Sequence, residues 1–236
     1  MTAKEERSKS AQAGGAPFVT VKFAQSLDGR IATSAGDSQW ISSPSSLRLA
    51  HQLRREHDAI IVGIGTALAD DPRLTVRLVG GRDPLRIVVD SRLRLPASAR
   101  VLADGAARRT LVATTEMADG DRASEIERLG AEVLMLPARA GREQVDLRAL
   151  LEELGRRGIK SALVEGGSGI ITSLLVERLV NRLVVVIAPR IIGKGIEAIG
   201  DLNVARLTDA INFSEFKTRR LGPDIVFDGR IEWKDK

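Results

Sequence analysis

The chain contains no cysteine among its 236 residues. Disulfides, thiolate metal sites and cysteine nucleophiles are therefore excluded. Histidine is scarce as well: the two histidines, His51 and His57, are six positions apart and so do not share a helical face. Without thiolates or paired imidazoles, we expect no bound metal ion.

Aromatic residues make up only 3% of the chain, and tyrosine is absent. Single-stranded nucleic acids are commonly bound by aromatic side chains on which the bases stack, and such platforms are nearly missing here. The chain is nevertheless basic, with 36 Lys and Arg residues against 31 Asp and Glu residues, a net charge of +5 and a pI of about 9.9. Because the cations are scattered, this charge favours a phosphorylated metabolite or a dinucleotide over nucleic acid.

No apolar run approaches the length of a membrane span, so we expect no membrane association. Residues 1–17 are charged and rich in small residues, and they lack the apolar segment of a signal peptide. This composition predicts a disordered tail and a cytoplasmic protein. No linker follows residue 17, and we predict a single domain over residues 18–236.

Alternating strand and helix patterns predict the α/β class. We expect strands at residues 18–23, 58–62, 85–89, 110–114, 132–136, 161–165 and 183–187, and helices at 44–55, 124–129, 146–157 and from about 170. Residues 212–221 and 225–233 flank a Gly-Pro-Asp turn and predict a hairpin. The predicted fold is a central, mostly parallel sheet with helices on both faces and an antiparallel C-terminal hairpin.

The segment of residues 60–77 combines a buried strand with a charged loop. Its β-branched run ends at Gly63 and Gly65, which predict a tight turn. The charged residues that follow are Asp70, Asp71, Arg73 and Arg77. A loop after a buried strand is a common place for chemistry in α/β proteins, but a solvated turn with a local ion pair explains the same pattern. The residues alone leave both interpretations open.

A second glycine-rich segment, residues 166–169, lies between a predicted strand and a predicted helix. Small residues at this place expose backbone N–H groups at the positive end of a helix dipole, which suits a phosphate, although an ordinary turn also explains them. Neither glycine-rich loop matches the Rossmann fingerprint. Ser91 and Arg92 follow a strand that ends at Asp90, and a hydroxyl beside a cation suits the 2′-phosphate of NADP.

Three further residues have side chains that suit a phosphorylated heterocycle. Glu165 ends the strand before the 166–169 segment, where a carboxylate can accept hydrogen bonds from ring N–H groups or interact with the helix dipole. Arg54 and Arg77 are candidates to bind a phosphate of the substrate.

Six segments in the same order resemble the reductase domain of riboflavin biosynthesis, a family with a dihydrofolate-reductase-like fold. They are Ser26–Arg30, Ser38–Ile41, Val62–Arg77, Arg86–Ser91, Leu163–Gly167 and Ile187–Gly193. The resemblance extends from about residue 18 to the C-terminus. It implies a stand-alone reductase, because the deaminase half of bifunctional members needs cysteine for its zinc site.

The resemblance implies NADPH-dependent reduction of a phosphoribosylamino-pyrimidine to its ribitylamino form, with hydride passing from the nicotinamide to C1′ of the opened sugar. Matched by position, the substrate contacts are Ser38, Arg54, Leu74, Arg77 and Glu165. The NADP contacts are Gln25, Trp40, Thr66, Asp70, Ser91, Gly167, Ser168, Gly169, Ile170, Ile171, Thr172 and Ser173. Gln25 stands where some members have Ala, which places that contact on the backbone or alters it. Asp70 is also the candidate for proton transfer near the reacting carbon.

Two other functions share these features. A dihydropterin or dihydrofolate reductase would have the same fold, and a non-catalytic NADP-binding or nucleic-acid-binding module would share the basic charge. Within the reductase family, bacterial members act on 5-amino-6-(5-phosphoribosylamino)uracil, whereas archaeal and fungal stand-alone members act on 2,5-diamino-6-ribosylamino-4(3H)-pyrimidinone 5′-phosphate. A stand-alone architecture favours the second substrate. The family also implies a homodimer, with the C-terminal strands at the interface.

Overall fold

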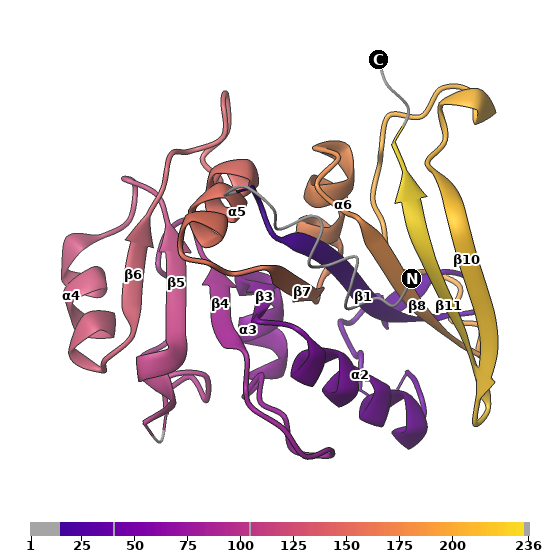
Figure 1. Cartoon of the computed structure of the whole chain (residues 1–236), viewed down its shortest axis with the longest axis horizontal. Helices are drawn as coiled ribbons and strands as arrows, with labels where there is room; N and C mark the ends of the chain where they lie inside the picture. Colours follow the sequence, from indigo (N-terminus) through magenta and orange to yellow (C-terminus); the bar gives the residue numbers. More distant parts are fainter. Residues whose placement is uncertain (1–14, 40, 104, 234–236) are drawn as a thin grey trace. The chain divides into compact units, whose positions relative to one another are not determined.

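The computed structural model describes residues 15–39, 41–103 and 105–233 (Figure 1). Residues 1–14 of the predicted tail therefore lie outside the described residues. The chain divides into two compact units. Of the described residues, the first unit comprises those in the ranges 15–18 and 54–162, and the second comprises those in the ranges 19–53 and 163–233.

Four parallel strands form the sheet of the first unit (Figure 1). In spatial order they are β3 (Ala59–Gly63), β4 (Leu85–Val89), β5 (Thr110–Thr114) and β6 (Glu132–Met135). The central strands are apolar, β-branched runs that are mostly buried, as expected where a sheet is covered on both faces. The register pairs Ala59 with Leu85 and Arg86 with Thr110. The amino ends of these strands therefore lie side by side, on the same side of the sheet.

Short helices follow these strands. They are α3 (Ile64–Asp70), the 3-10 helix η1 (Ala106–Arg109), α4 (Gly120–Arg128) and α5 (Leu147–Arg156). The Asp146 carboxylate accepts a hydrogen bond from the Ala149 N–H at 3.0 Å and so caps α5. Helix α5 is amphipathic, with one face that buries Leu147, Leu150, Leu151 and Leu154.

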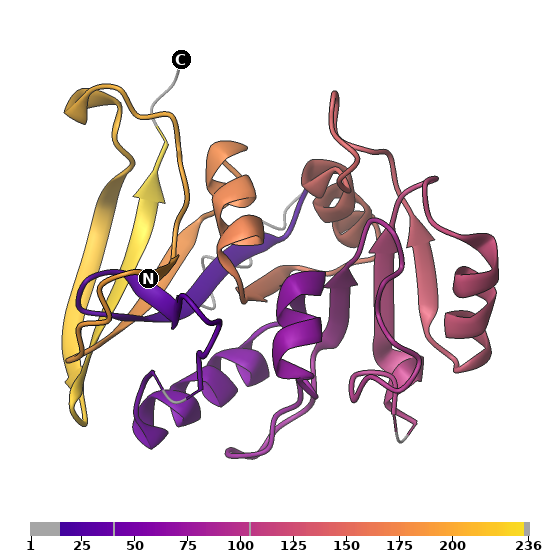
Figure 2. The same ribbon diagram turned by 180° about the vertical axis from the view of Figure 1, so that it is seen from behind.

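The second unit contains a mixed sheet and a separate strand pair. In the sheet, β1 (Phe18–Ser26) runs parallel to β8 (Arg182–Ala188), and β11 (Asp224–Glu232) is antiparallel to both β8 and β10 (Asn212–Leu221). The β10–β11 hairpin, yellow in Figures 1 and 2, forms the sheet edge. The separate pair joins β2 (Arg30–Thr33) to β9 (Gly195–Glu197). Strand β7 (Ser161–Glu165) begins in the first unit and ends in the second.

The remaining elements are α2 (Pro44–Glu56), α6 (Ser168–Val176) and the 3-10 helix η2 (Leu207–Asp209). As the Ser-Pro pair predicts, Pro44 is the first residue of α2. The buried Asp224 carboxylate secures this end, accepting hydrogen bonds from the Ser43 N–H at 2.8 Å and the Ser46 hydroxyl at 2.5 Å. The buried face of α2 includes Leu49, whereas Leu47 is 37% exposed.

The predicted fold class is confirmed: the protein is α/β, with mostly parallel strands and an antiparallel C-terminal hairpin. Several local predictions were wrong. A helix, α3, occupies residues where a loop was expected, β2 and β9 were not expected, and α4 begins four residues earlier than the predicted start at Ser124. Within the described ranges, no helix combines the length and apolarity needed to cross a membrane.

Candidate active site

The residues predicted to bind ligands divide between the two units. The first unit holds Arg54, Thr66, Asp70, Leu74, Arg77 and Ser91. The second unit holds Gln25, Ser38, Glu165 and the turn made of Gly167, Ser168, Gly169, Ile170, Ile171, Thr172 and Ser173. Trp40 lies outside the described residues.

The two predicted phosphate-binding arginines share one anchor residue. Arg54, near the end of α2, donates from Nη1 to the carbonyl oxygen of Thr75 at 3.2 Å. Arg77 donates from Nη1 to the Thr75 hydroxyl at 2.8 Å. Arg54 is only 8% exposed, whereas Arg77 is exposed. Thr75 therefore holds both guanidinium groups close together in the fold.

Other cations surround Arg77. Partial burial lowers the pKa of Arg77 most, and the positive charges of Arg54, Arg100 and Arg73 lower the pKa further. Arginine stays protonated at physiological pH even so. The group thus concentrates positive charge around Arg77, and a dianionic phosphate bound there would relieve the repulsion.

The first half of the charged loop is the short helix α3. Gly63 is its N-cap, with φ −79°, and Gly65 lies in its first turn, so neither glycine has the positive φ that a tight turn would require. Thr66 lies on this helix, and Asp70 is its last, exposed residue. Asp71 forms the C-cap at φ 39°, and its carboxylate accepts the Arg100 N–H at 2.7 Å.

Leu74 has a left-handed backbone, with φ 54°, and its side chain is only 2% exposed. A buried side chain cannot meet a ligand at the surface. If Leu74 contacts the substrate, its backbone N–H or carbonyl group must make the contact.

At the carboxyl end of β4, Ser91 uses its hydroxyl oxygen to accept the Val145 N–H at 3.0 Å. The hydroxyl hydrogen is not used by that bond and can be donated to a phosphate. Asp90, immediately before it, is fully buried and accepts the Leu95 N–H at 2.8 Å; burial raises the pKa of Asp90. Arg92 forms an ion pair with Glu143, so binding a 2′-phosphate would require Arg92 to exchange that partner.

In the second unit, the glycine-rich turn leads directly into α6. Gly166 has φ 134°, a conformation open to glycine, and Gly167 is the N-cap with no side-chain hydrogen bond to the helix. The helix begins at Ser168, earlier than the predicted Ile170. A Cβ atom on Gly169 would meet nothing within 4 Å, so the first turn faces open space. The first N–H groups of α6 are therefore suited to an anion.

The rest of this turn contributes in different ways. Ile171 is fully buried, so only its backbone can contact a cofactor. Thr172 accepts the Gly200 N–H at 2.8 Å through its hydroxyl oxygen. Glu165 ends β7 with a partly exposed side chain, and Gln25 and Ser38 are also partly exposed. These three side chains are accessible to a ligand.

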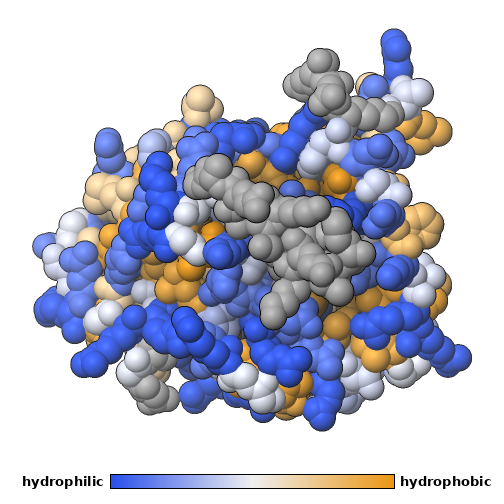
Figure 3. Space-filling view, in the orientation of Figure 1, coloured by the Kyte–Doolittle hydropathy of each residue, from blue (hydrophilic) through white to orange (hydrophobic). Residues whose placement is uncertain are grey.

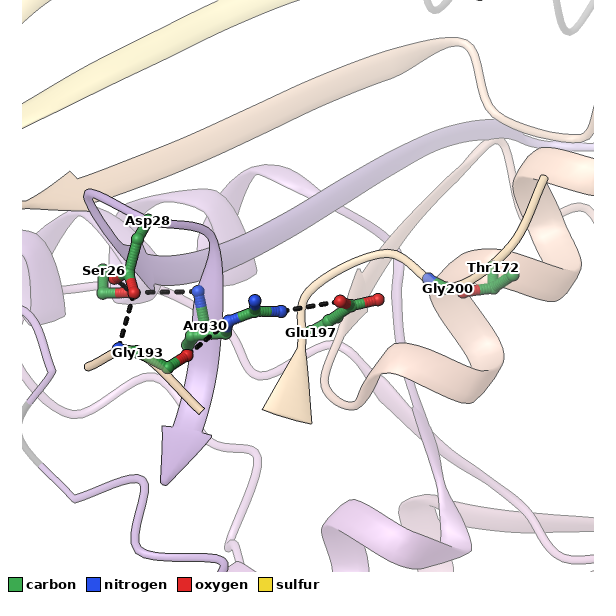
Figure 4. Close-up of polar contacts among 7 residues, drawn as sticks. All are labelled: Ser26, Asp28, Arg30, Thr172, Gly193, Glu197 and Gly200. Atoms are coloured by element: carbon green, nitrogen blue, oxygen red, sulfur yellow. Dashed lines mark hydrogen bonds and ion pairs between the residues drawn. The ribbon is translucent and has the colours of Figure 1, made fainter. Parts of the chain in front are cut away.

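A cluster at the start of β2 was not predicted to be functional (Figure 4). Asp28 accepts hydrogen bonds from the Ser26 hydroxyl at 2.6 Å, the Ile192 N–H at 3.0 Å and the Gly193 N–H at 2.7 Å. Arg30 donates to the Gly193 carbonyl at 2.9 Å and pairs with Glu197 at 2.7 Å. The segment after β8 is thus tied to the β1–β2 turn.

The chain is similar to known proteins in sequence and in structure. Residues 17–227 match the family described as the RibD C-terminal domain. The chain belongs to the RibD C-terminal domain family. The chain is 43% identical over 222 residues to the 2,5-diamino-6-ribosylamino-4(3H)-pyrimidinone 5′-phosphate reductase of Methanothermobacter thermautotrophicus. The match covers 92% of this chain and 99% of that protein.

The chain also resembles longer proteins. It is 39% identical over 211 residues to the riboflavin biosynthesis protein RibD of Aquifex aeolicus, covering 89% of this chain and 56% of that protein. The chain thus spans about half the length of the RibD relatives first matched. Among solved structures, RibD of Acinetobacter baumannii gives a TM-score of 0.83 at 26% identity, covering 97% of this chain and 62% of that chain. Riboflavin biosynthesis reductase Rib7 of Saccharomyces cerevisiae gives 0.72 at 26% identity, covering 92% and 90%.

Asp28 lies within the Ser26–Arg30 segment of the family resemblance, which gave it no role of its own. Its three hydrogen-bond donors include two backbone N–H groups more than 160 positions away, which no local pattern reveals. Since Gly200, farther along the same segment, bonds to Thr172 of the glycine-rich turn, the segment connects Asp28 with α6. Among the described residues, no group of three or more His, Asp or Glu side chains is arranged to hold a metal ion.

Replacing Asp28 with Asn should lower the free energy of unfolding at neutral pH and flatten its dependence on acid. The Ser26 hydroxyl and then the N–H groups of Ile192 and Gly193 lower the pKa of Asp28 from 3.8 to about 2. A lowered pKa means that the folded state favours the ionised form, so this stabilisation is complete above pH 3.8 and is lost as the pH falls towards about 2. Urea unfolding across this window measures the slope.

The control variant is Asp37→Asn, which changes an exposed carboxylate of the neighbouring turn that accepts the Gln39 N–H. It should keep the wild-type dependence on acid. Equal slopes for wild type and Asp28→Asn would show that the Asp28 hydrogen bonds do not stabilise the fold.

Proposed function

We propose that the chain is an NADPH-dependent pyrimidine reductase of riboflavin biosynthesis, which converts a phosphoribosylamino-pyrimidine to its ribitylamino form. Its membership of the RibD C-terminal domain family supports this activity. The observation that carries the choice of a phosphorylated substrate is the anchoring of Arg54 and Arg77 on Thr75. Two guanidinium groups held by one residue suit a phosphate better than the unphosphorylated ring of a pterin.

The nicotinamide cofactor fits the glycine-rich turn of the second unit. The start of α6 has no side-chain cap, and Gly169 leaves open space beside its first turn. Backbone N–H groups in such a setting bind phosphate oxygens well. The proposed cofactor contacts are Gln25, Trp40, Thr66, Asp70, Ser91 and Gly167 to Ser173. When bound, NADPH supplies the hydride that reduces C1′ of the substrate.

The proposed substrate contacts bind different chemical groups of the substrate. Arg54 and Arg77 bind the ribose phosphate, and Glu165 accepts N–H groups of the pyrimidine ring. Ser38 and the backbone of Leu74 complete the set. Asp70, at the exposed end of α3, is the general acid that helps to open the sugar ring and protonates the nitrogen that becomes the amine. Holding these partners in position supplies most of the catalysis.

The proposed substrate is the 2,5-diamino pyrimidine, which the name of the Methanothermobacter relative specifies for that protein. Purified protein should be assayed with this compound and with 5-amino-6-(5-phosphoribosylamino)uracil, following the loss of nicotinamide absorbance with NADPH and with NADH. Faster turnover of the diamino compound with NADPH supports the full proposal. Reduction of dihydrofolate but of neither pyrimidine would replace it with the pterin alternative. Salt-sensitive binding of random DNA without any reductase activity would instead support the non-catalytic module.

We also propose a homodimer that uses the C-terminal hairpin. Strand β10 is exposed along nearly its whole length, and such an edge invites pairing with another chain. Phe216, 62% exposed, stacks on Phe227 at 5.4 Å, and Phe213 meets the same ring edge-on at 4.9 Å. Apolar side chains come to the surface along this edge in Figure 3. An exposed aromatic cluster on an open strand suits a second copy.

Replacing Phe216 with Ser should weaken dimerisation by roughly tenfold or more, because truncating a buried aromatic anchor at an interface commonly costs at least 1–2 kcal/mol. Sedimentation velocity over a concentration series measures the monomer–dimer equilibrium. Lys217→Ser, a change at the next position of the same strand, is the control and should leave the equilibrium nearly unchanged. A wild-type protein that stays monomeric throughout the series would contradict the proposal.

A further inference from the structure

A cavity of about 490 Å³ opens at the amino ends of the strands in the first unit. Its lining includes His57 and Asp58 just before β3, Arg82 and Asp83 before β4, and Arg109 before β5. Arg54 and Arg77 of the proposed reductase site are neighbours of this lining, because Asp83 accepts a hydrogen bond from the Val76 N–H, next to their Thr75 anchor. Thr66 and Ser91 of that site instead follow the carboxyl ends of strands. Because these strands are parallel, the cavity lies at the opposite end of the strands from Thr66 and Ser91.

The lining is rich in arginine. Three arginines, Arg55, Arg82 and Arg109, face two aspartates, a balance of 3 − 2 = +1. A fourth arginine, Arg86, is 3% exposed and donates from Nε to the carbonyl oxygen of Arg109 at 3.4 Å. This buried guanidinium adds positive charge behind the wall, which the Asp83 carboxylate partly offsets.

The two aspartates do not neutralise the arginines of the lining. Asp58 Oδ2 accepts the N–H groups of Lys160 and Ser161 and the Ser161 hydroxyl, each at 3.0 Å. Asp83 Oδ1 accepts the Val76 N–H at 2.6 Å. Over the part of the chain that the structure describes, neither carboxylate forms an ion pair with a lining arginine. The carboxylates serve the backbone, and the cationic forks remain available.

Two of the arginines are held in place by the fold. Arg109 donates from Nη2 to the carbonyl oxygen of Asp83 at 2.6 Å. The stem of Arg55 packs over Gly81, where an added Cβ would come within 2.4 Å of its Cγ, and Arg55 Nη1 reaches the carbonyl oxygen of Gly80 at 3.4 Å. Arg82 is exposed and has no hydrogen bond or ion pair with any described residue.

We propose that this cavity binds a small phosphorylated molecule, with its phosphate held by Arg55, Arg82 and Arg109. Planar guanidinium forks match phosphate oxygens in pairs, and pre-positioned forks lose little freedom on binding. The volume lies within the usual range for small-molecule sites, and Pro84, Leu85 and Ile159 give the cavity an apolar side for the rest of the ligand. A concave site of this size suits a single metabolite rather than a nucleic-acid strand.

The test uses inorganic pyrophosphate as the probe and the two histidines as reporters, observed by NMR on the full chain. His57 lines the cavity, whereas His51 is 1% exposed within α2 and serves as the internal reference. Pyrophosphate should shift the imidazole signals of His57 in a saturable manner and leave those of His51 nearly unchanged. The titration is run in the Arg77→Ala variant, which weakens the proposed substrate-phosphate site by removing one of its two guanidinium groups.

Arg82→Gln should weaken the affinity for pyrophosphate by about tenfold, as expected for the loss of one charge-assisted contact. Arg108→Gln is the matched control, because Arg108 is an exposed arginine beside Arg109 that does not line the cavity. Both variants alter exposed side chains, and circular dichroism verifies their folding. An absent His57 shift, or equal weakening by Arg82→Gln and Arg108→Gln, would overturn the proposal. The titration needs no reductase substrate, so its failure leaves the proposed function standing.

Discussion

Replacing Asp70 with Asn should lower kcat by about a hundredfold or more, while changing the affinity for NADPH little. Positioned general acids and bases commonly contribute factors of roughly 10² to 10⁴, and Asn retains the size of Asp without its exchangeable proton. Asp70 is the last residue of α3, with an exposed side chain, so the substitution leaves the core intact. Steady-state kinetics with the preferred pyrimidine, together with a fluorescence titration of NADPH, separates the two effects.

The adjacent carboxylate offers a close control. Asp71 is the C-cap of α3 in the left-handed region, where Asn is well tolerated, and its oxygen accepts the Arg100 N–H. Asp71→Asn can keep both that bond and the left-handed conformation, and it should therefore leave kcat within about twofold. An unchanged kcat in Asp70→Asn would remove Asp70 from proton transfer. An equal loss in both variants would point to the end of the helix instead.

Replacing Arg77 with Ala should raise the KM for the phosphorylated substrate by about 10- to 150-fold. Hydrogen bonds to charged groups contribute roughly 1.5–3 kcal/mol, and Arg77 supplies one of two guanidinium groups anchored on Thr75. The guanidinium is exposed, so its loss should cost the fold little stability. The measurement compares KM for the phosphorylated substrate with KM for the analogue that lacks the phosphate.

Arg73→Ala is the matched control, since Arg73 lies on the same loop and contributes to the positive field around Arg77. Removing it should raise KM only slightly, because exposed charges a few residues away act through screened, long-range attraction. If Arg77→Ala weakens the phosphate-free analogue as much as the substrate, the residue binds another part of the molecule.

Strands bounded by clear turn residues were the easiest to predict. The predicted bounds of β4, β5, β7 and β10 match the structure because each is a distinct run flanked by turn residues. Helix α3 was missed because it has only seven residues and because glycine occupies its N-cap, Gly63, and its first turn, Gly65. The charged residues at its end also resemble those of a loop. Strands β2 and β9 are short and only partly buried, so they leave no clear alternation to detect.

The candidate site was predictable as a set of residue types but not as a set of contacts. Arg54 reaches Thr75 across 21 positions, and the sequence gives no reason to choose Thr75 as the anchor of both arginines. The function of Asp28 depends on amide groups of Ile192 and Gly193, which come near it only after β8 has paired with β1. Long-range hydrogen bonds of this kind are consequences of the fold, and local patterns do not encode them.

Leu74 limits what an evolving sequence can place at the centre of this loop. Its backbone needs a residue that tolerates φ 54°, while its buried position needs a large apolar side chain. Glycine satisfies the backbone but leaves a cavity, valine and isoleucine fill the space but resist the left-handed conformation, and asparagine buries an amide. Few single substitutions are therefore open at this position. Drift of the loop should proceed through Arg73, whose exposed side chain meets no such double demand and has no proposed contact with the substrate.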